Sequence, residues 1–288
     1  MQPSRFGQDI IGLALAEDLG SGDATTRYFP LRRGPVTARI VARQSCVLAG
    51  GATAIEVFRR VSDQIEASGL LPEGTRVTEQ DAVLRLRGPA EALVAAERTA
   101  LNFLQRLSGV ATLARAYVDA IAGTQARILD TRKTTPGFRE LEKAAVRAGG
   151  GTNHRMSLGD MILVKDNHLA ASRGIPALQE GIRRAKSQGL SVEVEVDTLD
   201  QLTEALRLDG VDILLLDNMP PPLLAQAVAM RKPGVLLEAS GGITLHNVRA
   251  IAETGVDRIS IGALTHSAPA ADFGLDFDEP NEPGHVHL

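Results

Sequence analysis

The second part of the chain alternates short apolar runs with amphipathic segments. From about residue 111 onward, runs of β-branched or aliphatic residues recur roughly every 20 to 35 residues, the length of one strand–helix unit. The runs are ARILDT (126–131), MILVKD (161–166), SVEVEVD (191–197), DILLLDN (212–218), GVLLEAS (234–240) and RISIGAL (258–264). Segments with helical periodicity lie between them: ALQEGIRRAKSQ (177–188), LDQLTEALRL (199–208), PPLLAQAVAMR (221–231) and LHNVRAIAETG (245–255). The pattern predicts a parallel sheet built from repeated βα units.

The first part of the chain has a different pattern. VTARIVARQSCVLAGG (36–51) and GTRVTEQDAVLRLRG (74–88) resemble strands joined by turns. A long helical stretch (89–122) follows, for which we expect a break at Ser108-Gly109. We therefore predict an N-terminal α/β sandwich domain over residues 1–112 and a barrel domain over 113–266, with the segment 267–288 packing on the first domain.

The number of apolar runs favours an incomplete (β/α) barrel. Six or seven strands are fewer than the eight of a standard barrel, unless another strand hides in LEKAAVRAGGG (141–151). An open nucleotide-binding sheet would carry a strand–GxGxxG–helix unit, and a P-loop enzyme would carry GxxxxGK[ST]; neither pattern is present. The predicted fold class is α/β.

Composition narrows the classes of function. Aromatic residues make up 3% of the chain, too few for a platform that stacks single-stranded nucleic acid, and the net charge of −4 provides no general attraction for polyanions. The lone Cys46 allows no internal disulfide, the first ten residues lack the apolar core of a signal peptide, and no apolar run is long enough for a membrane span. We expect a cytoplasmic protein with no nucleic-acid or membrane partner.

Polar side chains or, at the last strand, the bare backbone of a glycine stand at the end of every predicted strand of the second part. The carboxyl ends of parallel barrel strands carry the functional residues, so these side chains are expected to converge on one site. They are Thr131, Arg132 and Lys133; Lys165; Glu195 and Asp197; Asp217; Glu238 and Ser240; and Gly262. In isolation each has an ordinary explanation, such as a solvated loop or a turn, and it is their succession on neighbouring strands that predicts a site.

These groups divide by charge. Arg132, Lys133 and Lys165, together with the loop residues Asn153-His154-Arg155, would form a cationic wall, and Glu195 and Asp217 an acidic one. Of Glu193 and Glu195 in the same strand, we expect one to face inward and the other to pair with a helix outside. The glycine-containing ends SGGI (240–243) and IGA (261–263) suit a phosphate group, because bare backbone allows N–H groups to approach its oxygens. The sequence thus predicts a polyanionic substrate and a divalent metal.

These motifs resemble those of the quinolinate phosphoribosyltransferase family. The resemblance rests on ILDTRKTTPGFRELEKAAVRAGGGTNHRMSLGDMILVKDNH (128–168), supported by ALAEDLGSGDATT, AERTALNFLQRLSGVAT, VEVEVDT, LLLDN, EASGGI and GVDRISIGALTHS. It extends from residue 8 to about residue 277. It implies conversion of quinolinate and phosphoribosyl pyrophosphate to nicotinate mononucleotide, pyrophosphate and CO₂ in the de novo route to NAD.

The resemblance also implies roles for individual residues. Quinolinate would be surrounded by Arg98, Arg132, His154, Arg155 and Lys165, with Lys133 shared with the pyrophosphate and Thr131 beside it. Mg²⁺ on phosphoribosyl pyrophosphate would be held by Glu195 and Asp217. The 5′-phosphate would be cradled by Ser240, Gly241, Gly242 and Gly262, with His266 near the pyrophosphate. The residues expected to be catalytic are Lys133, Lys165, Glu195 and Asp217.

Members of this family are homodimers with shared active sites. By resemblance, Arg98 would reach the active site of the other subunit, and assembly beyond the dimer stays open. From the residues alone, Arg98 lies on an otherwise apolar helix face near Glu97 and Asn102, where a surface or intersubunit salt bridge is the alternative.

Two alternatives of the same fold stay open. One is the phosphoribosyltransferase-like paralogue associated with molybdate transport, which departs from the family at TTPG and NHRM…KDNH. The other is a non-enzymatic phosphoribosyl pyrophosphate sensor, which would lose Arg132 or the metal-binding acids. Nicotinate is a less suitable substrate, because it has one carboxylate and the predicted site has more cations than one carboxylate needs.

Overall fold

The computed structural model describes residues 9–165 and 175–278 and divides into two compact units. The first contains the chain up to Thr112 and the segment that begins at Pro269, and the second contains Leu113–Ala268. Residues 279–288 of the C-terminal segment, and Asp166, Asn167 and His168 of the family motif, lie outside the described residues.

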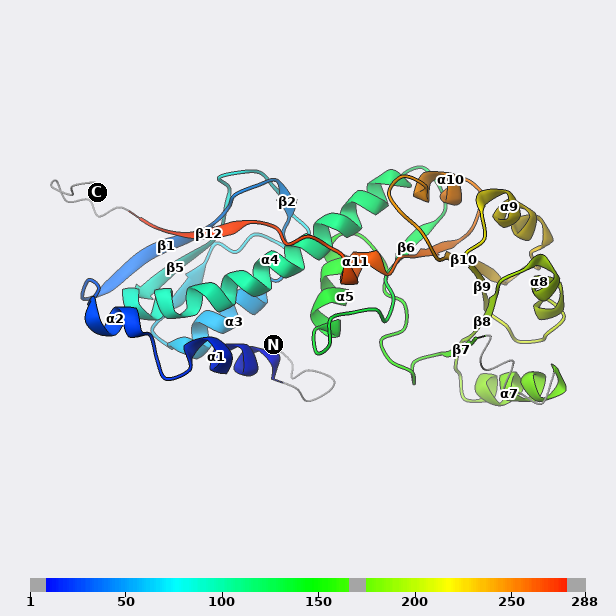
Figure 1. Ribbon diagram of the computed structural model, residues 1–288, viewed down its shortest axis with the longest axis horizontal. Helices are drawn as coiled ribbons and strands as arrows, with labels where there is room; N and C mark the ends of the chain where they lie inside the picture. The colour runs from blue at the N-terminus through cyan, green and yellow to red at the C-terminus, as the bar shows by residue number, and fades with distance from the viewer. Residues whose placement is uncertain (1–8, 166–174, 279–288) are drawn as a thin grey trace. The chain divides into compact units, whose positions relative to one another are not determined.

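The first unit is built on an antiparallel sheet (Figure 1). Its four strands follow the order β12 (Phe273–Phe277), β1 (Pro35–Ala42), β5 (Ala82–Pro89) and β3 (Glu66–Ser68). A separate pair joins β2 (Cys46–Val47) to β4 (Arg76–Val77). The helices are α1 (Ile10–Leu19), α2 (Ala24–Tyr28), α3 (Gly51–Val61) and the start of α4 (Ala90–Ala120). Strand β12 pairs with β1 from Ala38↔Phe277 to Ala42↔Phe273, so the C-terminal segment completes this sheet.

Helix α4 is continuous, so the predicted break at Ser108-Gly109 is wrong. The small residues there serve close packing. The Ser108 hydroxyl accepts a hydrogen bond from Ala49 N and donates one to Ala49 O. A β-carbon at Gly109 would lie 2.0 Å from the carbonyl oxygen of Pro269, which leaves room for glycine alone. A glycine within a helix is tolerated where tertiary packing requires it.

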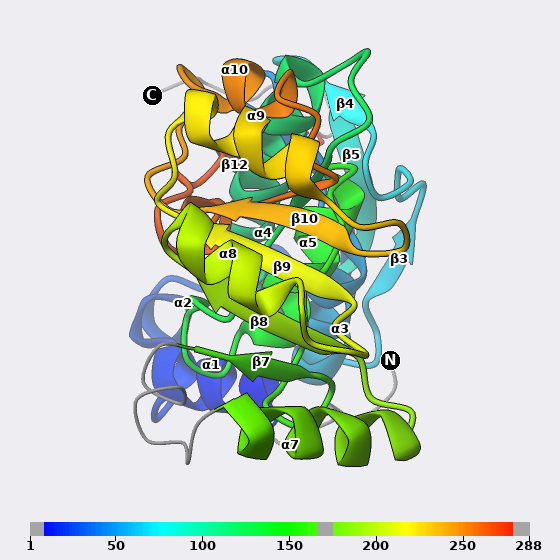
Figure 2. The same ribbon diagram turned by 90° about the vertical axis from the view of Figure 1, so that its right-hand side faces the viewer.

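The second unit contains a six-stranded parallel sheet (Figure 2). The hydrogen-bonded order is β6 (Arg127–Leu129), β11 (Arg258–Ser260), β10 (Leu236–Ser240), β9 (Ile213–Asp217), β8 (Val192–Val196) and β7 (Ile162–Val164). Each strand coincides with one of the predicted apolar runs. The segment 141–151 contributes no strand, because most of it belongs to helix α5 (Arg139–Ala148).

Helices follow the strands in alternation. They are α7 (Ile175–Ser187), α8 (Leu199–Ala205), α9 (Pro221–Met230), α10 (Val248–Ala252) and α11 (Ala263–His266). In Figures 1 and 2, α8 and α9 lie on the same face of the sheet. Local signals set the helix starts: Thr198 and Gln201 form a capping box at α8, and α9 begins with proline. The α/β class, with six parallel strands rather than eight, is confirmed.

Among the helices of residues 9–165 and 175–278, none combines the length and apolar character that a membrane crossing requires.

Candidate active site

The carboxyl ends of the six parallel strands lie at one edge of the second unit's sheet. Ser240 at the end of β10 is in register with Asp217 at the end of β9 and with Ser260 at the end of β11. Lys165 directly follows β7, and Thr131 lies two residues beyond β6. Parallel pairing therefore brings together side chains that are far apart in the sequence.

A cavity of about 270 Å³ opens at this edge. Its lining contains most of the residues predicted from the strand ends: Thr131, Arg132, Lys133, His154, Arg155, Lys165, Glu195, Asp217 and Ser240. It also contains Glu238, which was expected at a strand end but given no role, and three residues that were not predicted: Leu163, Leu215 and Ser260.

Of the residues to which the resemblance gives a role, five are outside this lining, as are Asp197 and Asn153. Gly262 and His266 are adjacent to it: a β-carbon at Gly262 would lie 3.0 Å from Lys133 Cδ and 3.2 Å from His266 Nε2. Gly241 and Gly242 directly follow β10, which ends on the lining residue Ser240. Arg98 belongs to the part of α4 in the first unit, where its side chain is exposed.

Gly241 meets a steric requirement at the strand end. Its φ is +90°, a conformation that residues with side chains rarely adopt, and a β-carbon there would lie 2.1 Å from Asn218 Oδ1. Asn218, itself at φ +53°, donates its backbone N–H to Ser240 O and its side-chain N–H to Asp217, at 2.8 and 2.6 Å. The turns after β9 and β10 therefore support each other at the edge of the cavity.

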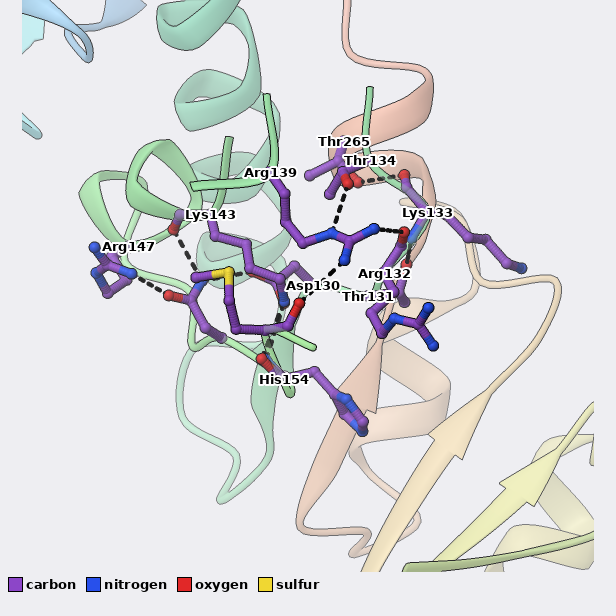
Figure 3. A network of polar contacts seen from close by, with 12 residues as sticks. Asp130, Thr131, Arg132, Lys133, Thr134, Arg139, Lys143, Arg147, His154 and Thr265 are labelled. Atoms are coloured by element: carbon purple, nitrogen blue, oxygen red, sulfur yellow. Dashed lines mark hydrogen bonds and ion pairs between the residues drawn. The ribbon is translucent and has the colours of Figure 1, made fainter. Parts of the chain in front are cut away.

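Side chains of α5 and α11 hold the loop after β6 (Figure 3). Lys133 N donates to Thr131 Oγ1 at 3.0 Å, and Thr265 Oγ1 donates to Lys133 O at 2.8 Å. Arg139 donates to Thr134 Oγ1 at 3.0 Å and to the carbonyl oxygen of Arg132 at 3.4 Å. On the loop side, these hydrogen bonds involve only backbone and hydroxyl groups. The charged ends of Arg132 and Lys133 take no part in them.

A buried ion pair joins this loop to the second cationic segment. Asp130 and Lys143 are both fully buried and form a salt bridge. Asp130 also accepts from Asn153 Nδ2 and from His154 N, the latter at 2.9 Å, while Lys143 donates to His154 O at 3.0 Å. Burial raises the pKa of Asp130 and lowers that of Lys143, and their mutual attraction opposes both shifts. The network fixes the end of β6 against residues 153–155 (Figure 3).

The cations of the cavity are crowded. Burial, followed by the nearby charge of Arg132, lowers the pKa of Arg155. Arg132 Nε is buried and has no hydrogen-bond partner among the described residues. Two neighbouring guanidinium groups repel each other because both are positively charged. An anion between them offsets this repulsion and accepts a hydrogen bond from the unpaired Nε–H.

The acidic residues face the cations from neighbouring strands. Lys165 Nζ lies 2.6 Å from Glu195 Oε2, and the Glu195 side chain is 13% exposed. Burial, and then the charge of Asp197, raises the pKa of Asp217. A carboxylate whose charge is disfavoured in this way gains from a cation.

The expected pairing of one of the two glutamates of β8 with a helix outside is wrong. Glu193 and Glu195 are two residues apart in β8, and side chains at that spacing share one face of a strand. Both face the cavity side: Glu195 lines the cavity, and the fully buried Glu193 lies 2.9 Å from His154 Nε2. No helix of residues 9–165 and 175–278 pairs with Glu193 on the outside.

Glu238 is another acid of the cavity; it was expected among the strand-end residues but was given no role. It lies two residues before Ser240 on the same face of β10, and its Oε1 lies 3.6 Å from His154 Nε2. Neither of its oxygens has a hydrogen-bond partner in the described residues. Burial, then the charge of Glu193, raises the pKa of Glu238 to about 7. The sequence signal for both was a charged residue two positions before a predicted site residue, Glu193 before Glu195 and Glu238 before Ser240.

Comparison with known proteins identifies the family. The model of the quinolinate phosphoribosyl transferase C-terminal domain matches residues 110–276, and that of the N-terminal domain matches residues 23–108. The chain belongs to the quinolinate phosphoribosyltransferase family.

Relatives in this family match over most of their length. A probable nicotinate-nucleotide pyrophosphorylase (carboxylating) of Bacillus subtilis is 41% identical, covering 92% of this chain and 91% of the relative. The nicotinate-nucleotide pyrophosphorylase (carboxylating) of Homo sapiens is also 41% identical, covering 84% and 82%. The solved structure of the nicotinate-nucleotide pyrophosphorylase from Francisella tularensis is 38% identical with a TM-score of 0.89, covering 93% of this chain and 95% of that one.

Proposed function

We propose that this chain is a quinolinate phosphoribosyltransferase, nicotinate-nucleotide diphosphorylase (carboxylating), of de novo NAD biosynthesis. It joins quinolinate to phosphoribosyl pyrophosphate and releases pyrophosphate and CO₂. The observation that carries the proposal is one cavity in which Arg132, Lys133, Arg155 and Lys165 face Glu195 and Asp217. This arrangement suits a dianionic acid next to a pyrophosphate. Family membership and the names of the relatives support the same reaction.

The cations answer two chemical demands. The bond between the sugar C1′ and the pyrophosphate oxygen breaks while C1′ bonds to the ring nitrogen, and the cations stabilise the negative charge that develops on the leaving group. Loss of the 2-carboxylate as CO₂ leaves an electron pair on the ring carbon, which the alkylated ring nitrogen and adjacent cations stabilise until a proton is added. The side chains bind and orient, and no covalent nucleophile is needed.

The acids fit a magnesium ion that accompanies phosphoribosyl pyrophosphate. Mg²⁺ is bound in proteins by one or two carboxylates together with substrate phosphates. Glu195 and Asp217 offer such oxygens from adjacent strands, and burial and the charge of Asp197 raise the pKa of Asp217, so a bound cation would favour its charged form. The ion would neutralise charge on the leaving pyrophosphate.

We assign the remaining roles by family. Thr131, Arg132, His154, Arg155 and Lys165 would bind quinolinate, Lys133 and His266 the pyrophosphate, and Ser240, Gly241, Gly242 and Gly262 the 5′-phosphate. The active form would be a homodimer in which Arg98 completes the site of the partner subunit.

The first test is product formation with a matched pair of acids. Purified protein is incubated with phosphoribosyl pyrophosphate, Mg²⁺ and either quinolinate or nicotinate, and nicotinate mononucleotide and CO₂ are measured. We expect product from quinolinate only, because the crowded cations need both carboxylates. Product from nicotinate alone would contradict the assignment of the acid, and no product from folded protein would favour the molybdate-associated paralogue or a sensor.

A further inference from the structure

His154, Glu193 and Glu238 form a buried cluster beside the cavity. They come from the loop before β7, from β8 and from β10, and their ligand atoms all lie within 4.8 Å of one another. The His154 side chain is 7% exposed, and the two glutamates are fully buried. His154 and Glu238 also line the cavity, so the cluster borders the space in which we place the substrates.

The contacts of the cluster determine how the imidazole ring is held. His154 Nε2 lies 2.9 Å from Glu193 Oε2 and 3.6 Å from Glu238 Oε1, and both partners are acids. A carboxylate oxygen only accepts hydrogen bonds, so the shorter contact places a proton on Nε2. The other ring nitrogen, Nδ1, has no hydrogen-bond partner among the side chains of the described residues. The backbone of His154 is anchored separately by Asp130 and Lys143.

The surrounding charges favour a second proton on the ring. Burial lowers the pKa of His154, and the charge of Lys143 lowers it further. The hydrogen bond to Glu193 and the charges of Glu238 and Glu193 raise it more, so the pKa is raised overall. Around Glu238, the opposing cations are His154 and Arg258, whose NH1 lies 3.9 Å from Oε2. A ring in this setting offers Nδ1–H as a donor.

We propose that Glu193 and Glu238 are positioning residues that hold the His154 ring with Nε2 turned to the acids, leaving Nδ1–H to donate a hydrogen bond to a carboxylate of the substrate. The inference rests on the proposed function, which places a dicarboxylic acid in this cavity. It explains why two buried acids lie beside a site for an anion: they orient and charge the residue that contacts it.

The geometry favours this role over a metal site. The same three residues carry ligand types that bind divalent cations, and carboxylate oxygens of Glu193 and Glu238 have no hydrogen-bond partner among the described residues. However, a 2.9 Å contact between Nε2 and Glu193 is an ordinary hydrogen bond, which a metal would have to break. Zinc binding is therefore an outcome that the experiment must distinguish.

The test compares an isosteric series at each acid. Glu193→Gln and Glu238→Gln keep an oxygen that accepts from Nε2–H but remove the charge, while Glu193→Met and Glu238→Met remove both. His154→Asn tests the contact residue. Glu253→Met is the matched control, because Glu253 is a half-exposed acid paired with Arg249 outside the cavity. For each variant we would measure kcat, the KM of each substrate separately, and thermal unfolding.

We expect the Met variants to raise the KM for quinolinate about tenfold to a hundredfold, the range for a lost hydrogen bond to a charged group. The KM for phosphoribosyl pyrophosphate should change less than about twofold, and the Gln variants should fall between wild type and Met. The melting temperature should stay or rise in Glu238→Met, because burial and the charge of Glu193 disfavour the Glu238 carboxylate, and it should fall in Glu193→Met, which loses the hydrogen bond to His154. A merely structural role would lower stability and shift both KM values together.

Imidazole ¹⁵N spectra provide a readout that is independent of turnover. His154→Asn assigns the ring signals, which in wild type should show protons on both Nε2 and Nδ1 and in Glu193→Met a neutral ring with a mixture of tautomers. This spectrum and the Gln variants carry the test if a Met variant fails to fold.

Each remaining outcome has a definite meaning. A normal KM for quinolinate in both Met variants, with a raised KM in His154→Asn, would overturn the positioning role and leave the proposed function standing. A normal KM for quinolinate in His154→Asn would also refute the proposed hydrogen bond between His154 and a substrate carboxylate. Stoichiometric zinc retained by wild type and lost in the Glu193 variants would replace the proposal by a metal site. Inactive wild-type protein would instead refute the proposed function.

Discussion

Lys133 and Lys165 illustrate two states of a cation at a strand end. No described residue pairs with the ammonium group of Lys133, whose backbone is held by Thr131 and Thr265. Lys165 instead contacts Glu195 at 2.6 Å and is 44% exposed. The first cation is available to a substrate at once, and the second has to be shared with an acid that we assign to Mg²⁺.

We expect Lys133→Ala and Lys165→Ala to impair catalysis much more than folding. Lys133→Ala removes a charge that would stabilise the leaving pyrophosphate, and Lys165→Ala removes one that would stabilise the decarboxylating ring, so each should lower kcat about a hundredfold to a thousandfold. Because both side chains are solvent-accessible, the free energy of unfolding should change by less than about 1 kcal/mol. Steady-state kinetics and chemical denaturation measure the two effects.

Lys232→Ala is the matched control for these variants. Lys232 is an exposed lysine in the loop after α9 and is not part of the cavity lining. Its removal should leave both quantities unchanged. If Lys133→Ala or Lys165→Ala lost stability in proportion to turnover, their role would be structural.

Helix α5 acts as a template for the cationic half of the site. Arg139 bonds to the 131–134 loop and, at 3.1 Å, to Met156 O. Glu142 accepts from Thr135 N and Oγ1 at 3.0 and 2.8 Å, and Lys143 pairs with Asp130. One helix thereby sets the spacing between two segments that bear cations.

We expect Lys143→Met to destabilise the protein by about 3–5 kcal/mol. The substitution leaves the buried carboxylate of Asp130 without its ion-pair partner, and an uncompensated buried charge is costly. Lys186→Met is the matched control: Lys186 pairs with Asp212 at 2.8 Å but is 39% exposed, so its loss should cost less than about 1 kcal/mol. Urea denaturation measures the free energy of unfolding of both variants. An equal loss in the two would show that burial does not make the Asp130–Lys143 pair more important for stability.

At the scale of the whole molecule, two units contribute to the proposed active form. The cavity belongs entirely to the second unit, whereas Arg98 lies exposed on α4 in the first. Beside it, burial raises the pKa of Glu97, and the charge of Arg98 opposes this shift. The exposure of Arg98 suits our proposal of a site that is shared between subunits.

We expect mixtures of Arg98→Ala and Lys133→Ala to regain activity that each lacks alone. In a shared-site dimer, a heterodimer carries both defects in one site and none in the other, so random exchange should restore up to about a quarter of wild-type activity per mixed protein. Activity is measured after subunit exchange, with each variant alone as the control. Mixtures that stay inactive although exchange is demonstrated would exclude the shared site.

Much of the fold followed from local patterns. The apolar runs that end at Asp130, Lys165, Asp197, Asp217, Ser240 and Gly262 became the six parallel strands, because buried parallel strands need continuous apolar sequence. The break expected in α4 is absent. Close packing on Ala49 and Pro269 determines the small residues Ser108 and Gly109, so here they do not signal the end of a helix. Local propensity is a weak guide where a tertiary contact determines the residue type.

The sequence by itself determined the class of fold and which strand ends carry charge, since both follow from periodicity and from the common edge of a parallel sheet. Only the tertiary structure decided how those charges are supported. It buried Lys143 with Asp130, and it brought Glu193 and Glu238 to His154. These partners are separated by many residues and meet through strand order and register, which no local pattern records. The physical reason is that the ionisation and orientation of a buried group depend on its neighbours in space.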